Sequence, residues 1–183
     1  MPILGLILLS NKNNLKKTRF YLLILALLFA FFGDVFLIFN SNFFLQGLLS
    51  FLITHVIYIL IFYNNLEFKK NFKFIFVLFV FVAYYLLLIQ FLSSYLDVLL
   101  IPVCIYGLSL VVMGFGAFLR TPKYGYGSVF VGALFFIFSD SILAVNQFVY
   151  DSNLKLAQVF VIILYVMAQY FIVKGLLEKR SEV

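Results

Sequence analysis

Residues Phe20–Phe39 read FYLLILALLFAFFGDVFLIF, a run in which Asp34 is the single charged side chain. A helix needs roughly 20 apolar residues to cross the hydrocarbon core of a bilayer, so this run has the length and composition of a membrane span. The whole chain has the same character. Hydrophobic residues make up 66% of its 183 residues, charged residues make up 11%, and the mean hydropathy is +1.16. About a quarter of the residues in soluble domains are charged, so the composition predicts a chain embedded in lipid.

Further apolar runs of spanning length follow along the chain. The sequence predicts six full spans in total, at Phe20–Phe39, Phe43–Tyr63, Phe72–Leu92, Leu96–Leu119, Gly127–Phe148 and Lys155–Leu177. A seventh run, Pro2–Leu9, is too short to span, and we interpret it as the end of a helix whose beginning is missing from this chain. The connections are short. We therefore expect an all-α, polytopic transmembrane helix bundle that forms a single integral membrane domain over residues 1–183.

The basic residues are distributed unevenly between the two sides of this predicted bundle. If the six spans alternate in direction, twelve of the thirteen lysines and arginines fall on one side and Lys155 falls on the other. Cytoplasmic loops retain such residues, so we expect a multi-pass protein of the cell membrane with a cytoplasmic C-terminus. The net charge of +6 does not indicate a nucleic-acid partner, because the basic residues lie in short loops between apolar runs.

Several polar side chains fall inside the predicted spans, where an ionisable group costs several kcal/mol unless it faces protein or water. Asp34 lies some 8 Å from the non-cytoplasmic end of its span and Asp140 some 12 Å, taking about 1.5 Å of rise per residue. His55 lies roughly 18 Å from that end by the same rule. Gln169 follows Tyr165 by four residues and shares its helix face. These depths are compatible with one polar pocket.

Two uses of such residues remain open at this point, besides purely structural ones. Asp34 and Asp140 can hydrogen-bond across helices, His55 can be a neutral packing histidine, and Tyr165 and Gln169 can bridge helices. Alternatively, two carboxyl groups at low dielectric do not both stay ionised, which supplies an acid and an anion. That pair suits hydrolysis through an oxocarbenium-like cation, and it equally suits proton relay or cation binding in a transporter. The sequence contains no motif for a phosphate loop, a nucleophile elbow or a metal.

Four groups of residues together resemble one known family. In order along the chain they are Gly33-Asp34; Ser50-Phe51 with His55 and Tyr58; Phe138-Ser139-Asp140 with Leu143-Ala144 and Phe148; and Tyr165 with Ala168-Gln169. They resemble the YhhN family, which includes the lysoplasmalogenases, over nearly the whole chain. Family members typically have eight spans. Here Met1-Pro2-Ile3-Leu4 resembles the middle of the family's second helix, so we expect that the first helix and part of the second are absent.

The resemblance implies an enzyme that hydrolyses the vinyl-ether bond of lysoplasmalogen, or of a related ether lipid, to a fatty aldehyde and a glycerophospho-alcohol. It implies that Asp34 and Asp140 are the catalytic pair, with Asp140 favoured as the acid because it lies deeper. Supporting roles then fall to His55, Tyr58, Ser139, Tyr165 and Gln169. The expected partner is a membrane lipid substrate, with no cofactor and no metal. The alternatives are a small transporter or ion-coupled carrier, and a non-catalytic membrane protein.

Overall fold

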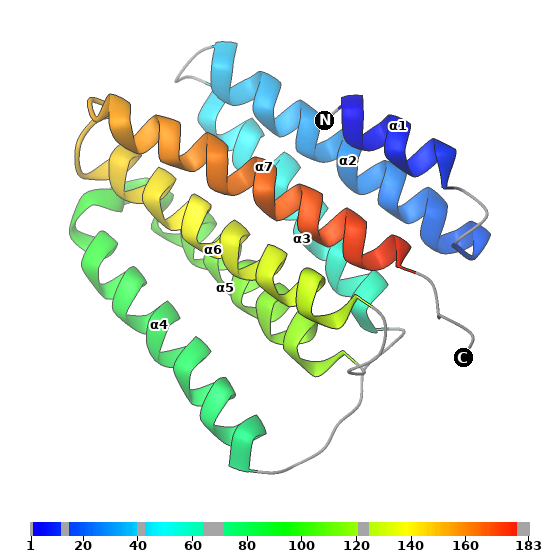
Figure 1. Ribbon diagram of the computed structural model, residues 1–183. Helices are drawn as coiled ribbons and strands as arrows, with labels where there is room; N and C mark the ends of the chain where they lie inside the picture. The colour runs from blue at the N-terminus through cyan, green and yellow to red at the C-terminus, as the bar shows by residue number, and fades with distance from the viewer. Residues whose placement is uncertain (1, 12–14, 40–42, 64–71, 121–124, 179–183) are drawn as a thin grey trace.

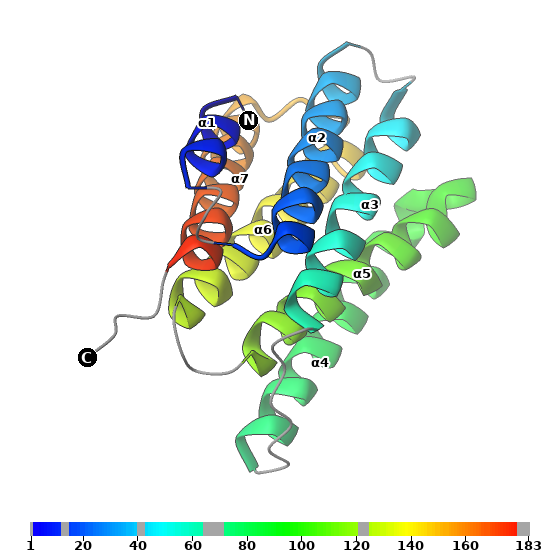
Figure 2. The ribbon, with the colours of Figure 1, turned by 90° about the vertical axis from the view of Figure 1, so that its right-hand side faces the viewer.

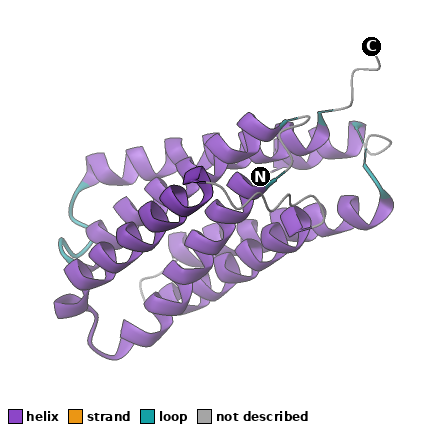
Figure 3. Cartoon of the chain, turned by 90° about the horizontal axis from the view of Figure 1, so that it is seen from below, coloured by secondary structure: helices purple, strands orange, loops and turns teal. Residues whose placement is uncertain are grey.

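The computed structural model describes residues 2–11, 15–39, 43–63, 72–120 and 125–178, and within these residues the chain is helical without a β-strand. The helices are α1 (Pro2–Ser10), α2 (Lys17–Phe39), α3 (Phe44–Tyr63), α4 (Phe72–Leu96), α5 (Leu100–Leu119), α6 (Tyr126–Phe148) and α7 (Lys155–Leu177). They run up and down a single bundle (Figure 1). Figure 3 shows that the connections lie at its two ends.

The predicted all-α membrane bundle is confirmed, because α2 to α7 fall on the six predicted spans and α1 on the short run before them. Among the described residues, five continuous helical segments are long and apolar enough to cross a membrane. One of them, Phe72–Leu119, has 48 residues and would extend about 72 Å as a straight helix, more than twice the hydrocarbon thickness of about 30 Å. The chain reverses within it at Asp97–Leu99, where Asp97 has a φ of +39°. This segment therefore supplies two antiparallel spans, and the chain is a multi-pass membrane protein.

The bundle is built from two tightly packed helix pairs with one helix between them. The largest interfaces are those of α6 with α7 and of α2 with α3, while α5 packs against α3, α6 and α4. Helix α4 lies at the edge of the bundle, and α1 lies beside α2 and α7 (Figures 1 and 2). The exterior of these helices is apolar: Phe79 and Leu87 on α4 and Ile162 on α7 are each at least 60% exposed. Such a surface is suited to lipid and not to water.

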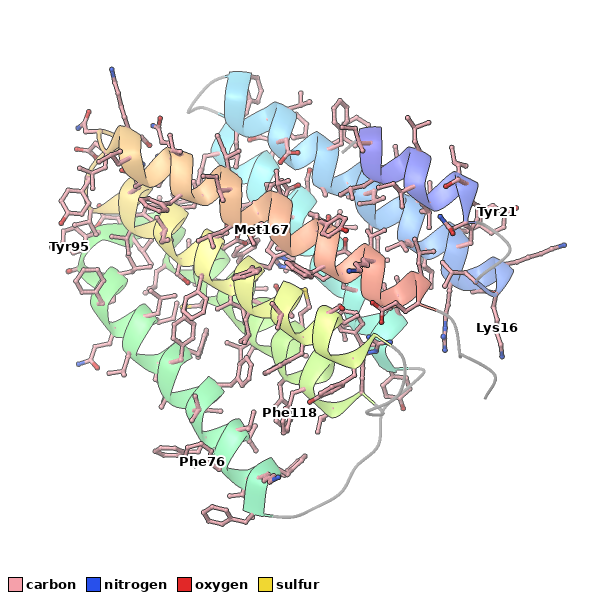
Figure 4. All side chains as sticks on the ribbon, in the orientation of Figure 1. Lys16, Tyr21, Phe76, Tyr95, Phe118 and Met167 are labelled. Atoms are coloured by element: carbon pink, nitrogen blue, oxygen red, sulfur yellow. The ribbon has the colours of Figure 1, made fainter. Side chains whose placement is uncertain are left out.

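The two ends of the bundle differ in charge. We call one the basic end; it carries Lys16, Lys17 and Arg19 beside the start of α2, Arg120 after α5, and Lys174 near the end of α7. Lys155 begins α7 at the opposite end. Figure 4 labels Lys16 at the basic end and Tyr95 at the opposite one. Six other basic residues that contribute to the predicted asymmetry lie outside the described residues: Lys12, Lys69, Lys70, Lys123, Lys179 and Arg180.

Small residues allow the paired helices to approach closely. A Cβ atom added at Gly132 of α6 would lie 2.8 Å from the carbonyl oxygen of Ala168 and 2.9 Å from the backbone nitrogen of Ile172, both on α7. The same interface closes at the basic end, where Gly125 has a φ of +66° and its added Cβ would lie 1.9 Å from the Gly175 carbonyl oxygen. Because backbone atoms cannot move aside as side chains do, these glycines set the distance between α6 and α7.

We expect Gly132→Ala to destabilise the bundle, because its new methyl group must push the α7 backbone away. Overpacking of this kind costs about 1–3 kcal/mol. Gly127→Ala is the matched control, since Gly127 lies in the same helix and a Cβ there would meet nothing within 4 Å. Thermal unfolding in detergent should therefore give a lower Tm for Gly132→Ala and a wild-type Tm for Gly127→Ala. Equal melting temperatures for the two variants would contradict the close contact.

Candidate active site

An apolar cavity lies among α2, α3, α4, α5 and α6, in the half of the bundle away from the basic end. Its volume is about 40 Å³, which admits roughly three water molecules. Three polar residues line it, Tyr106, Asp140 and Ser141. The remainder of the lining is apolar: Leu37, Phe44, Leu48, Phe51, Leu88, Ile89, Leu92, Val103, Gly107, Leu110, Leu143, Ala144 and Phe148.

Asp140 is the acidic residue of this cavity. It lies on α6, about 12 Å from the end of that helix, and 8% of its surface is exposed. The buried hydroxyl of Tyr106 on α5 donates a hydrogen bond to Asp140 Oδ2. An ionised carboxylate at this depth is costly without such a donor. Tyr106 thus stabilises the anionic form of Asp140 at the wall of an otherwise apolar cavity.

His55 of α3 lies beside the same carboxyl group. Its Nδ1 atom lies 3.1 Å from Ser109 Oγ, and the Ser109 hydroxyl donates to the backbone oxygen of Tyr106 at 2.6 Å. The Ser109 hydroxyl has one proton, which it donates to Tyr106. The hydrogen bond between His55 and Ser109 must therefore be donated by His55, so the hydrogen-bond network assigns the ring proton of His55 to Nδ1. Its Nε2 then carries a lone pair, and this atom lies 3.9 Å from Asp140 Oδ2. That distance is beyond hydrogen-bond range, so His55 packs beside the Asp140 carboxyl group without donating a proton to it.

Asp34 lies on α2 and is half-buried. Its carboxyl group interacts electrostatically with the Tyr165 side chain of α7, and Asp140 lies within electrostatic reach of both residues. The buried Tyr165 hydroxyl meets no acceptor with the geometry of a standard hydrogen bond, so its contact with Asp34 is electrostatic. Two carboxyl groups and a phenol from three helices thus share one region of the bundle.

The ring of Phe51 contacts neighbours of Asp34 and also lines the cavity. On one side it fills the space beside Gly33, where an added Cβ would lie 2.6 Å from Phe51 Cε2. It also packs edge-on against Tyr165, with 5.7 Å between the ring centroids, and it lines the cavity itself. Asp140 lines the cavity and Asp34 does not. The described cavity therefore contains one of the two carboxyl groups that the sequence places in a single pocket.

The other predicted supporting residues hold helices together. The Tyr58 hydroxyl of α3 donates to Gln169 Oε1 of α7, and both side chains are fully buried. Ser139 of α6 donates to the carbonyl oxygen of Val161 on α7 at 2.9 Å. These contacts are interhelical hydrogen bonds of the kind that join membrane helices. The structure does not bring Ser139 to the cavity.

Three buried polar atoms of the predicted supporting residues have no hydrogen-bond partner: His55 Nε2, Tyr165 Oη and Gln169 Nε2. Buried polar groups are normally hydrogen-bonded, and none of these three residues lines the cavity. Among the described residues, no three His, Cys, Asp or Glu side chains lie close enough to bind a metal ion together. Chemically, the arrangement offers a carboxyl group at the cavity, a second one within electrostatic reach of it, and a tyrosine that donates to the first.

Tyr106 was missed by the sequence analysis, as were Ser141, Tyr84 and Ser109. Ser141 lines the cavity, hydrogen-bonds to Tyr84 of α4, and donates to the Ile137 carbonyl oxygen. A signal for the two tyrosines exists in the sequence. Tyrosines favour the membrane interfaces, and a tyrosine well inside a span needs a partner for its hydroxyl. Tyr106 lies six residues after the start of α5, which satisfies this criterion.

Comparison with known proteins identifies the family of this chain. The sequence pattern of the YhhN family matches residues 1–176, essentially the whole chain. No curated protein and no solved structure shows significant similarity to it. The matched residues include both intramembrane aspartates and the helices that carry them. The chain therefore belongs to the YhhN family.

Proposed function

We propose that this protein hydrolyses the vinyl-ether bond of lysoplasmalogen, or of a related ether lipid, with Asp34 and Asp140 as the acid–base pair. The products are a fatty aldehyde and a glycerophospho-alcohol. Membership of the YhhN family supports a lysoplasmalogenase-like membrane protein. The observation that carries the proposal is the position of Asp140, a buried carboxyl group on the wall of an apolar cavity with a second carboxyl group within electrostatic reach.

The first step is a proton transfer to carbon. Asp140 is the more buried of the two carboxyl groups, and two carboxyl groups at low dielectric do not both stay ionised. Asp140 therefore holds the proton and gives it to the outer carbon of the vinyl ether. The carbon next to the ether oxygen becomes an oxocarbenium ion. Tyr106 donates to the carboxylate that is left behind, and this anion, with Asp34, stabilises the cation.

Water completes the reaction. It adds to the cationic carbon and loses a proton to the Asp140 carboxylate, which restores the acid. The resulting hemiacetal collapses to the aldehyde, and the glycerol oxygen leaves with a proton as an alcohol. Each step balances with water as the sole co-reactant.

The depth of the cavity suits this bond. In a lysoplasmalogen the vinyl ether joins the single alkyl chain directly to glycerol, so it lies just below the headgroup. Asp140 lies about 12 Å from the end of α6, and the cavity between it and that end is lined by apolar side chains such as Leu92, Val103 and Phe148. Because about 40 Å³ is the space of a few water molecules and not of a lipid, we propose that the lining helices move apart when the vinyl ether reaches Asp140.

The central test is the production of aldehyde by the purified chain in detergent with lysoplasmalogen and no added metal or nucleotide. We expect Asp34→Asn and Asp140→Asn each to remove most of the activity, because an amide can neither deliver the proton nor balance the cation. General acid–base catalysis contributes about 10²–10⁴ in rate. Asp97→Asn is the matched control: Asp97 is exposed in the α4–α5 turn, and asparagine tolerates its positive φ as well as aspartate does.

Different functions predict different results in this experiment. An ion-coupled carrier would produce no aldehyde, either as wild type or as any variant. Aspartates that merely join helices would lose expression or thermal stability when substituted. A wild-type rate in either Asn variant would falsify the two-aspartate mechanism while leaving hydrolysis itself established.

A second prediction concerns Tyr106. We expect Tyr106→Phe to slow aldehyde formation by roughly 10- to 100-fold, because a hydrogen bond to a charged group is worth about 1.5–3 kcal/mol. Tyr95→Phe is the control, since Tyr95 is 48% exposed on α4 and lies at the end of the bundle opposite the basic end (Figure 4). The rates are compared at saturating substrate, with the Tm of each variant as a check of folding. Unchanged catalysis in Tyr106→Phe would remove this residue from the mechanism.

We also propose that the basic end faces the cytoplasm of the cell, so that the cavity opens towards the opposite leaflet. The distribution of lysine and arginine supports this orientation. A reporter fused at the C-terminus should read cytoplasmic, and one inserted at Ser152, in the α6–α7 turn, should read external. An external signal from the C-terminal fusion would reverse the proposed orientation.

A further inference from the structure

Arg120 is a buried cation that the proposed mechanism does not use. It directly follows α5 at the basic end, and 6% of its surface is exposed. Burial, and to a lesser degree the positive charge of Arg19, lowers the pKa of its guanidinium group to about 10. Arg120 therefore remains positively charged at neutral pH. A charge this deeply buried is costly unless it is paired and hydrogen-bonded.

The protein itself supplies little to compensate that charge. The Nε and Nη1 atoms of Arg120 are buried and have no hydrogen-bond partner. The guanidinium carbon lies 5.6 Å from the centroid of the Phe62 ring, and this cation–π contact offers no hydrogen-bond acceptor to the N–H groups. The C-terminal ends of α3 and α5, which lie at the same end of the bundle, contribute partial negative charge. They stabilise the cation without satisfying its donors.

No described carboxylate pairs with Arg120. Glu178, just beyond α7 at the basic end, accepts a hydrogen bond from Ser128 at 3.4 Å. The remaining described acidic residues are Asp34, Asp97, Asp140 and Asp151, and they lie within the spans or in turns at the opposite end. Within the described part of the chain, Arg120 forms no salt bridge. The acceptor that it lacks is thus not an acidic side chain of these segments.

The free donors of Arg120 define the chemistry of a ligand. A guanidinium group binds phosphate through two parallel N–H···O bonds, and phosphate offers several acceptor oxygens around one negative charge. The surrounding basic end raises the local concentration of anions, because Lys16 and Lys17 are exposed there and Lys174 lies nearby on α7. A membrane surface presents phosphate at this depth as phospholipid headgroups.

We propose that Arg120 is the centre of a phosphate-binding site at the basic end of the bundle, which takes a phospholipid headgroup or free phosphate. The site is separate from the cavity. Arg120 follows Tyr106 by fourteen residues along α5, a distance of about 21 Å. Loss of this site therefore leaves the reactive groups of the cavity in place, and the proposal stands independently of the hydrolase.

The binding experiment measures the Tm of the purified chain in detergent during three titrations. These use phosphatidylglycerol, a diacylglycerol with the same acyl chains, and inorganic phosphate against chloride at equal ionic strength. A rise in Tm with phosphatidylglycerol alone identifies a lipid headgroup site. A rise with phosphatidylglycerol and inorganic phosphate identifies a phosphate site that needs no acyl chains. The proposal is overturned if neither phosphate compound raises the Tm above its own control.

Variants assign the effect to Arg120. We expect Arg120→Gln to weaken the apparent binding of the phosphate compound by about 10- to 100-fold, because it loses a charge-assisted pair. Lys174→Gln is the matched control; it removes one charge from the same end, but its side chain is exposed and lies over the Tyr170 ring. Arg120→Lys keeps the positive charge but loses the paired N–H donors of the guanidinium group, so it should bind with intermediate affinity. This variant also provides the test if Arg120→Gln does not fold. Wild-type binding by either Arg120 variant would refute the assignment.

Discussion

The carboxyl group of Asp140 is the constraint on which the arrangement of the bundle depends. A carboxylate 12 Å inside a helix of a membrane bundle must find its donors within the protein, because lipid offers none. α5 supplies such a donor, the Tyr106 hydroxyl, and α3 packs His55 beside the same carboxyl group, with its ring fixed by Ser109 of α5. The α3–α5 and α5–α6 interfaces therefore both position side chains around Asp140. Moving any one of these helices would leave a buried polar group without its partner.

The close contact of α6 and α7 has a second effect on this centre. Gly132 and Gly175 bring the two helix backbones together, and the hydrogen bond from Ser139 to Val161 fixes their relative height. Tyr165 is thereby held in electrostatic contact with both carboxyl groups. The close packing of α7 against α6 and the polar centre are consequently linked, because α7 carries Tyr165, which interacts electrostatically with both aspartates.

Much of the fold could be predicted from the sequence, because hydropathy and span length are local properties. The six spans, and the reversal between α4 and α5, follow from the length of the apolar runs. The site was harder to predict, because it depends on which face of each helix meets which neighbour. Ser139 and Ser141 show this: residues two apart lie on different faces of a helix, so Ser139 meets α7 while Ser141 meets α4. Tyr106 was missed for the same reason, since its role depends on the neighbouring helix that carries Asp140.

The position of Asp140 at the cavity and of Asp34 outside it has a consequence for how the two carboxyl groups are hydrated. Asp140 borders the cavity and Asp34 does not, and Phe51, which lines the cavity, also packs edge-on against Tyr165, the residue in electrostatic contact with Asp34. A molecule that fills the cavity therefore displaces water from beside Asp140 and not from beside Asp34. Because loss of water disfavours the ionised form of a carboxyl group, filling of the cavity acts on the protonation of one member of the pair and leaves the hydration of the other unchanged.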